Sequence, residues 1–81
     1  MNGKDLRRLS DVADVAKLDL SPGAITLAPT DDGVLAWYSG SYAAGGVRAT
    51  VSHTLDRAVS IAPDEFRQLA TLFDDDAELR L

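Results

Sequence analysis

Apolar residues recur at three- and four-residue steps near the start of the chain. They are Leu6, Leu9, Val12, Ala13 and Ala16. A helix turns by roughly 100° per residue, so this spacing places all of them on one side. The pattern predicts an amphipathic helix from Lys4 to Lys17, with Arg7 and Asp11 on its polar side at the i,i+4 spacing of a weak ion pair. Ser21-Pro22-Gly23 then ends any helical continuation.

A two-residue period replaces the helical one in the middle of the chain, which is typical of β-strands. The predicted strands cover residues 24–28, 34–39, 47–52 and 57–62. The segment Pro29-Thr30-Asp31-Asp32-Gly33 has the residue types of a turn, so it joins the first two strands into a hairpin. Gly45-Gly46 is interpreted as a flexible loop before the third strand. The strand face toward the helices is expected to carry Val47, Val51, Val59 and Ile61.

Helical spacing returns after Pro63, a residue that the first turn of a helix tolerates. The apolar residues of this second helix are Phe66, Leu69, Ala70 and Phe73. Asp74-Asp75-Asp76 ends it in a charged loop, and residues 77–81 alternate like a further strand. Both helical stripes need a common apolar surface. The sequence therefore predicts an α+β fold, an antiparallel sheet of four or five strands with two helices on one face.

The length of 81 residues limits the chain to one small domain, residues 1–81. Hydrophobic residues make up 46% of it and Cys is absent, so folding depends on packing without disulfides. A core of this size contributes only about 3–5 kcal/mol. Self-association or incorporation into a longer chain would stabilise this small core further, and the sequence leaves both alternatives open. No apolar run reaches the length of a membrane span and no signal-peptide core follows Met1, so a cytoplasmic protein without membrane contact is expected.

The formal net charge of −5 argues against indiscriminate binding to nucleic acid or to anionic membranes. The local basic cluster Lys4, Arg7 and Arg8 lies at the start of the first predicted helix, and Arg67 lies on the second. Each of these side chains is either an ordinary solvated helix residue or a contact to phosphate. The sequence leaves both interpretations open.

Catalytic and metal chemistry is not indicated. His53 is the sole histidine, and a triad with Ser52 and Asp56 is not expected, because triad members are brought together by the fold and not by adjacency in a loop. The run Asp74-Asp75-Asp76 lacks the alternating ligands, central Gly and closing Glu of a calcium loop. We therefore expect no enzyme, no catalytic residue, no metal site and no cofactor.

Three aromatic residues lie close together in the sequence, Trp37, Tyr38 and Tyr42. Stacking of single-stranded bases on them is one interpretation. Adjacent strand residues point to opposite faces, however, and a small core needs most of its aromatic side chains. Packing in the core and at its rim is the preferred interpretation.

The order of the predicted elements is helix, three strands, a fourth strand, helix and strand. Segments that give this order a family likeness are Asp5–Val12, Ile25-Thr26-Leu27, Asp32-Gly33-Val34-Leu35, Tyr38-Ser39-Gly40-Ser41 and the stretch from Arg57 to Leu69. The arrangement resembles one domain of a DNA sliding clamp, especially the first domain of the bacterial polymerase III beta-subunit clamp. The likeness covers nearly the whole chain, and it implies that 81 residues form less than one complete clamp domain.

The resemblance implies a topological function and no catalysis. A ring of such domains encircles duplex DNA and tethers a DNA polymerase or other replication proteins, with helices lining the hole. Lys4, Arg7, Arg8 and Arg67 would then contact the DNA backbone without sequence preference, and the chain would self-associate or belong to a longer protein. The alternative is a small acidic protein-interaction module with the same layered fold, which dimerises through an exposed strand edge and never encircles DNA.

Overall fold

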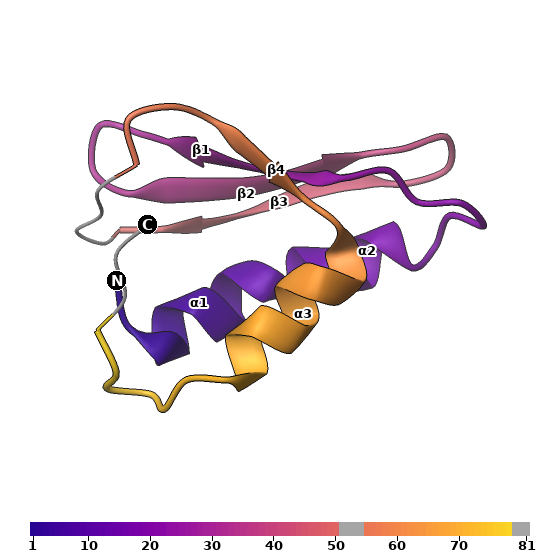
Figure 1. Ribbon diagram of the computed structural model, residues 1–81. Helices are drawn as coiled ribbons and strands as arrows, with labels where there is room; N and C mark the ends of the chain where they lie inside the picture. The colour runs from indigo at the N-terminus through magenta and orange to yellow at the C-terminus, as the bar shows by residue number, and fades with distance from the viewer. Residues whose placement is uncertain (51–54, 79–81) are drawn as a thin grey trace.

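The computed structural model describes residues 1–50 and 55–78. Its elements in chain order are α1 (Gly3–Ser10), α2 (Val12–Ala16), β1 (Ile25–Pro29), β2 (Val34–Ser39), β3 (Ala44–Ala49), β4 (Val59–Ile61) and α3 (Pro63–Thr71) (Figure 1). The four predicted strands are present; the strand predicted over 34–39 matches β2, and the other three have shifted bounds. The predicted α+β class with an antiparallel sheet is confirmed.

The predicted first helix divides into α1 and α2 at Asp11. Asn2 caps α1 reciprocally: its side-chain oxygen accepts the Asp5 N–H at 2.9 Å, and the Asp5 carboxylate accepts the Asn2 N–H. At the far end the Ser10 hydroxyl donates to the Arg7 carbonyl at 2.7 Å, and the Asp11 N–H bonds back to Arg8. These local bonds compete with the regular helical ladder. The helix tightens there, although Asp11 keeps right-handed helical angles.

The sheet has the strand order β3-β2-β1-β4, and every neighbouring pair is antiparallel. The prediction of a flexible loop at Gly45-Gly46 is wrong, because both residues lie within β3, opposite Tyr38 and Trp37. Close packing explains why glycine suits both positions. A Cβ on Gly45 would lie 3.3 Å from the Val15 side chain on α2, and one on Gly46 would lie 3.3 Å from the Trp37 ring.

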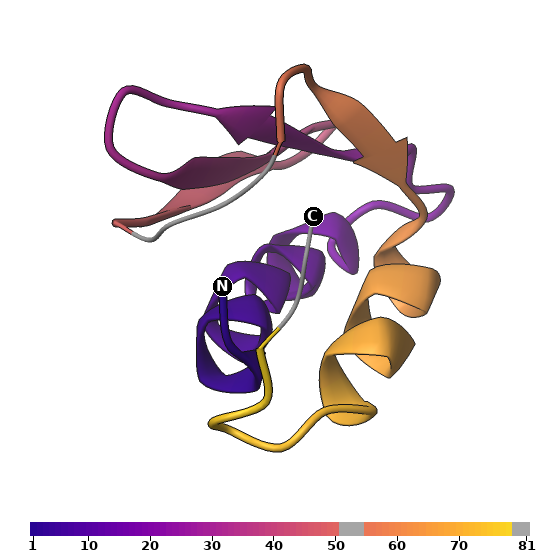
Figure 2. The same ribbon diagram turned by 60° about the vertical axis from the view of Figure 1, so that its left-hand side comes forward.

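Both helical regions lie on one face of the sheet, as predicted (Figures 1 and 2). The α1–α2 segment packs against β2 and β3, and α3 packs mainly against α1 and α2. Pro63 begins α3 without any need for a backbone N–H, and Asp64 and Glu65 favour its positive end. No described helix covers the opposite face of the sheet (Figures 1 and 2).

The core lies between the sheet and the helices. Its buried residues include Leu6, Leu9 and Val12 from the first helical region, Ile25, Leu27, Val34, Ala36, Tyr38 and Ala49 from the sheet, and Phe66 and Ala70 from α3. Val47 and Ile61 pack against this core in part. Val59 lies on the predicted face, opposite the buried Leu27, but it belongs to the short edge strand β4 and is 41% exposed. Val51 falls outside the described residues.

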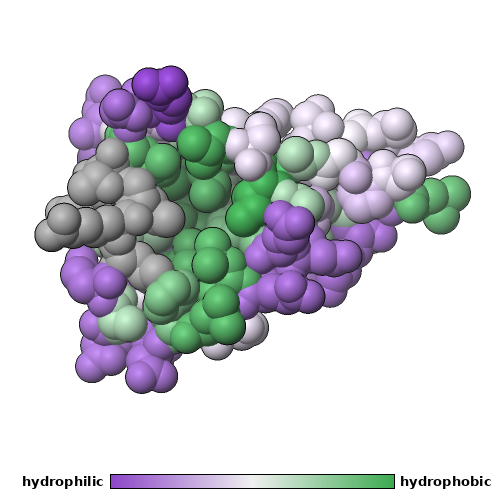
Figure 3. All heavy atoms as spheres, viewed as in Figure 1, coloured by the Kyte–Doolittle hydropathy of each residue, from purple (hydrophilic) through white to green (hydrophobic). Residues whose placement is uncertain are grey.

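Apolar surface also gathers over the space between the sheet and α3, with charged groups around it (Figure 3). The partly buried residues that pack against the core include Leu55, Ile61, Leu69 and Phe73. Near the chain ends a single antiparallel bridge joins Asn2 to Glu78, and residues 79–81 of the predicted last strand lie outside the described part. Among the described helices, none is long and apolar enough to cross a membrane.

Candidate nucleic-acid interface

The two lysine and arginine side chains that α1 presents to solvent are Lys4 and Arg8. They lie four residues apart, so the helix brings them onto the same face. No ion pair joins either of them to the described residues. Both charges are therefore available to an anionic partner.

The Arg7 side chain contacts the end of α3 and is not free in solvent. Its guanidinium donates to the carbonyl oxygens of Phe73 at 2.7 Å and Ala70 at 3.4 Å, which lie at the end of α3, and it forms an ion pair with Asp75. Cations stabilise the carbonyl end of a helix, so Arg7 fastens α3 to α1. The predicted pair between Arg7 and Asp11 is wrong, because these long-range contacts hold the Arg7 side chain.

Arg67 is also held by neighbours. Its guanidinium donates to the carboxylates of Asp14 at 2.7 Å and Asp11 at 3.4 Å and to the Ser10 hydroxyl at 3.3 Å. Lys17 lies 3.6 Å from the same Asp14 carboxylate. This network ties α3 to the α1–α2 segment and offsets the positive charge of Arg67 locally.

The structure thus separates the four predicted contacts into two pairs. Lys4 and Arg8 are exposed on α1, whereas Arg7 and Arg67 hold α3 in place through carbonyl and carboxylate groups. Nothing in the sequence pattern distinguishes the pairs, because the acceptors of Arg7 lie more than 60 residues away in the chain, at Ala70 and Phe73. A weak phosphate contact is the chemistry that the exposed pair supports.

A buried acid, Asp19, is the polar residue that sequence reasoning missed. It is 8% exposed, accepts a short hydrogen bond from the Tyr38 hydroxyl, and accepts the Tyr42 N–H at 2.9 Å. A Cβ on Gly40 would overlap the Asp19 and Tyr38 side chains, so a glycine is needed there. The cluster fastens the β2–β3 hairpin to the segment after α2. No pattern in the sequence marks Asp19, which stands between two exposed leucines.

The Tyr38 hydroxyl has a raised pKa. The hydrogen bond to Asp19 is the main cause, burial and the negative charge of Asp19 add to it, and a backbone hydrogen bond with Gly23 opposes it. The folded state therefore holds the phenolic proton more tightly than the unfolded state does. Its contribution to stability is complete below the ordinary Tyr pKa of 10.0 and is lost as the pH rises above it.

Tyr38→Phe should lower the midpoint of urea denaturation at neutral pH, because the buried Asp19 carboxylate loses a donor. The variant should also lose the part of the alkaline destabilisation that Tyr38 causes. Urea titrations between about pH 8 and pH 11 measure both effects near the ordinary pKa of 10.0. Tyr42→Phe is the control, since that ring is 82% exposed. Equal alkaline behaviour in the two variants would contradict the role of Tyr38.

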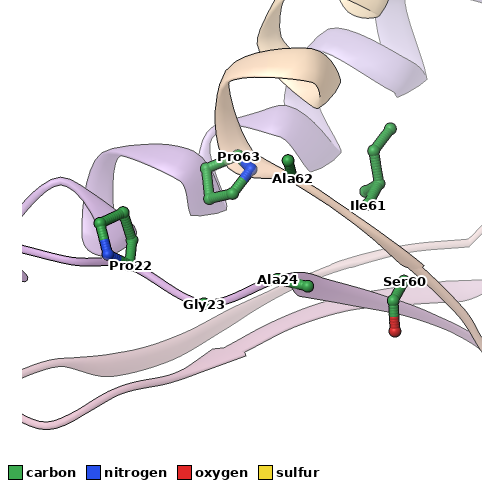
Figure 4. Close-up of a pocket in the computed structure, with 7 residues that line it drawn as sticks. All are labelled: Pro22, Gly23, Ala24, Ser60, Ile61, Ala62 and Pro63. Atoms are coloured by element: carbon green, nitrogen blue, oxygen red, sulfur yellow. The ribbon is translucent and has the colours of Figure 1, made fainter.

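A shallow pocket of about 220 Å³ lies where β1 begins and β4 leads into α3 (Figure 4). Its lining residues are Pro22, Gly23, Ala24, Ser60, Ile61, Ala62 and Pro63. They include no charged side chain and one hydroxyl, that of Ser60. The pocket offers neither a general base nor a charge for a polar ligand.

The described residues contain no group of three His, Asp or Glu side chains arranged to hold a metal ion. Within the acidic loop, Asp75 pairs with Arg7, and the Asp74 carbonyl accepts the Ala77 N–H at 3.1 Å. His53 and Ser52 fall outside the described residues. Of the three aromatic residues, Tyr38 is buried as predicted. The packing expected of Trp37 and Tyr42 is wrong, because Trp37 is 45% exposed on the outer face of the sheet and Tyr42 is 82% exposed.

Comparison with protein-family models, with curated proteins and with solved structures finds no match to this chain. The α+β layered fold defines the class of the protein.

Proposed function

We propose that the chain is a sliding-clamp-like processivity factor, or part of one, whose helical layer approaches duplex DNA. The observation that carries the proposal is the exposed pair Lys4 and Arg8 on that layer. Support also comes from the layered arrangement, with helices on one face of an antiparallel sheet (Figure 2). The fold alone does not imply this function, so the charges have to be tested directly.

Weak attraction to phosphate is what such a protein needs. Lysine and arginine release counterions when they meet the DNA backbone, which gives binding without sequence preference and a strong dependence on salt. The net charge of −5 keeps the rest of the surface from adhering to DNA. A ring that slides needs this combination of local attraction and general repulsion.

Ring formation requires more than one copy or more chain, because one small layer of four strands does not enclose a duplex. The partners of the proposed function are duplex DNA, further copies of the clamp unit, and a DNA polymerase or other replication protein. No cofactor takes part in it.

In the self-associated protein, replacing Lys4 and Arg8 together by Gln should weaken the binding of duplex DNA. The dependence of log K on log salt should become shallower by about 0.9 for each phosphate that the variant no longer neutralises. Fluorescence anisotropy with a labelled duplex across a salt series measures both quantities. Arg7 and Arg67 are left unchanged, because their hydrogen bonds hold α3.

Arg57→Gln combined with Ser60→Glu is the matched control. It makes the same change in net charge at exposed positions before and on β4, away from β3. The control should bind DNA nearly as well as the parent chain. Equal weakening in the two double variants would attribute the effect to net charge and would contradict a DNA-facing α1.

The second candidate function is an acidic protein-interaction module. Within the part of the chain that the structure describes, no strand pairs with the outer edge of β3, and this favours the second candidate because such an edge is a template for pairing with another chain. This candidate predicts association in the absence of DNA and no change in affinity for DNA when Lys4 and Arg8 are replaced.

A further inference from the structure

The two outer strands of the sheet are protected to very different degrees. β4 has three residues and is followed at once by Ala62 and Pro63, so it offers little backbone for pairing. β3 has six residues, contains neither proline nor lysine, and carries Arg48 as its one charged side chain. Short edge strands, prolines and charges are the devices that block pairing between sheets. β3 uses almost none of them.

The hairpin shows which backbone groups of β3 point outward. The Gly40 N–H donates to the Ala43 carbonyl at 2.8 Å, so that pair lies in the hydrogen-bonded position of the ladder. Hydrogen-bonded and non-bonded pairs alternate along an antiparallel ladder. Residues 45, 47 and 49 therefore bond to β2. The N–H and C=O groups of residues 44, 46 and 48 point to the open edge.

We propose that β3 pairs antiparallel with β3 of a second copy around a two-fold axis at Val47. This axis brings Gly46 of one copy opposite Arg48 of the other, twice, and both residues have outward backbone groups. Gly46 of one copy and Arg48 of the other also lie on the same face of the combined sheet, because the two positions are two residues apart along the strand. The helical layers of both copies then lie on the same side.

The side chains on the outer face fit this register. Arg48 is long and charged, and it would lie opposite Gly46, which has no side chain to obstruct it. Trp37 lies beside Gly46 on β2 and is 45% exposed on the same outer face. The guanidinium of the second copy can therefore extend over Gly46 toward the indole ring, which favours a cation. The proposed pairing of the two β3 strands thus accounts for Gly46, for Arg48 and for the exposure of Trp37.

Pairing of six-residue strands buries a small area, which is typical of weak association. We expect a dimer that dissociates in the micromolar range. The proposal involves no DNA, so its failure and the failure of the clamp proposal are separate outcomes.

Three variants at position 46 test the register. Gly46→Glu places a carboxylate opposite Arg48 of the second copy, Gly46→Lys places a like charge there, and Gly46→Gln is the neutral reference. All three introduce the same tight Cβ, 3.2 Å from the Ala36 carbonyl oxygen, so this cost cancels between them. Dimer affinity should increase in the order Lys, Gln, Glu, with about a three- to tenfold change in Kd per step.

Net charge alone predicts the reverse order, because the chain already carries −5 and an added glutamate increases the repulsion between copies. Ser60→Lys and Ser60→Glu on β4 are the matched controls, and they should follow net charge. Sedimentation equilibrium gives the Kd values, and circular dichroism checks that each variant is folded. The reverse order at position 46 would overturn the proposal.

Amide hydrogen exchange gives an independent readout that needs no variant. Gly46 and Arg48 should become more protected as the concentration of the 81-residue chain rises, whereas Val47 should be protected throughout, because it bonds within the monomer. Exchange that stays independent of concentration to high micromolar levels would overturn the dimer. Protection of the β3 edge that appears only with a different protein would assign the edge to that partner and would also overturn it.

Discussion

Phe66→Ala should lower the free energy of unfolding by about 3–5 kcal/mol, the usual cost of removing a fully buried aromatic ring. Phe66 is completely buried and belongs to the core cluster between the sheet and the helices. It is one of the two fully buried residues that α3 contributes. Because a core of this size supplies only about 3–5 kcal/mol in total, the variant should be largely unfolded at 25 °C.

Phe73→Ala is the matched control. Phe73 has the same side chain but is only partly buried, beyond the end of α3. Phe73→Ala should lower the free energy of unfolding by clearly less than Phe66→Ala does. The backbone carbonyl at position 73 remains available to Arg7. Urea denaturation followed by circular dichroism measures both variants. Similar destabilisation would show that burial does not determine how α3 is held to the core.

Gly33→Ala should destabilise the fold by about 2–3 kcal/mol or more, at the upper end of the cost of overpacking. A Cβ on Gly33 would overlap the carbonyl oxygen of Ala49 and lie 2.9 Å from its carbonyl carbon. These are backbone atoms of β3, which pairs with β2 at Val34 and Ala49. A side chain could rotate away from the added methyl group, but a paired strand cannot.

Gly23→Ala provides the contrast, because a Cβ there would meet nothing within 4 Å. This substitution should leave stability unchanged or raise it by about 0.4–1 kcal/mol through the lower entropy of the unfolded chain. Thermal denaturation of the two alanine variants under the same conditions makes the comparison. A Gly33→Ala variant as stable as the parent would mean that the start of β2 can move away from β3.

The position of the charges changes how the helical layer is interpreted. The sequence indicates four basic residues as candidates for DNA contact, but Arg7 and Arg67 each bridge α3 to the first helical region. Replacing them would disrupt the way α3 is held, so these two positions do not test the proposed contact with phosphate. Lys4 and Arg8 are the residues at which the two effects can be separated.

Local patterns were sufficient for most elements. The three- and four-residue spacing of Leu6, Leu9 and Val12 predicted the buried side of the first helical region, and that of Phe66 and Ala70 predicted the buried side of α3. The two-residue period predicted β2 with the bounds that the structure has. Such periods report which side of an element faces the core, so they allowed the α+β class and the single helical face to be inferred.

Other features depend on contacts between residues far apart in the sequence. The extension of β3 through Gly45 and Gly46 is determined by pairing with β2 and by the Val15 side chain on α2, and local propensity argued against it. The burial of Asp19 follows from Tyr38. The choice between a solvated and a structural arginine at position 7 depends on carbonyl groups of α3. A periodic pattern carries no information about such partners, because it records only whether a position faces the core, and the tertiary structure alone decides which groups meet.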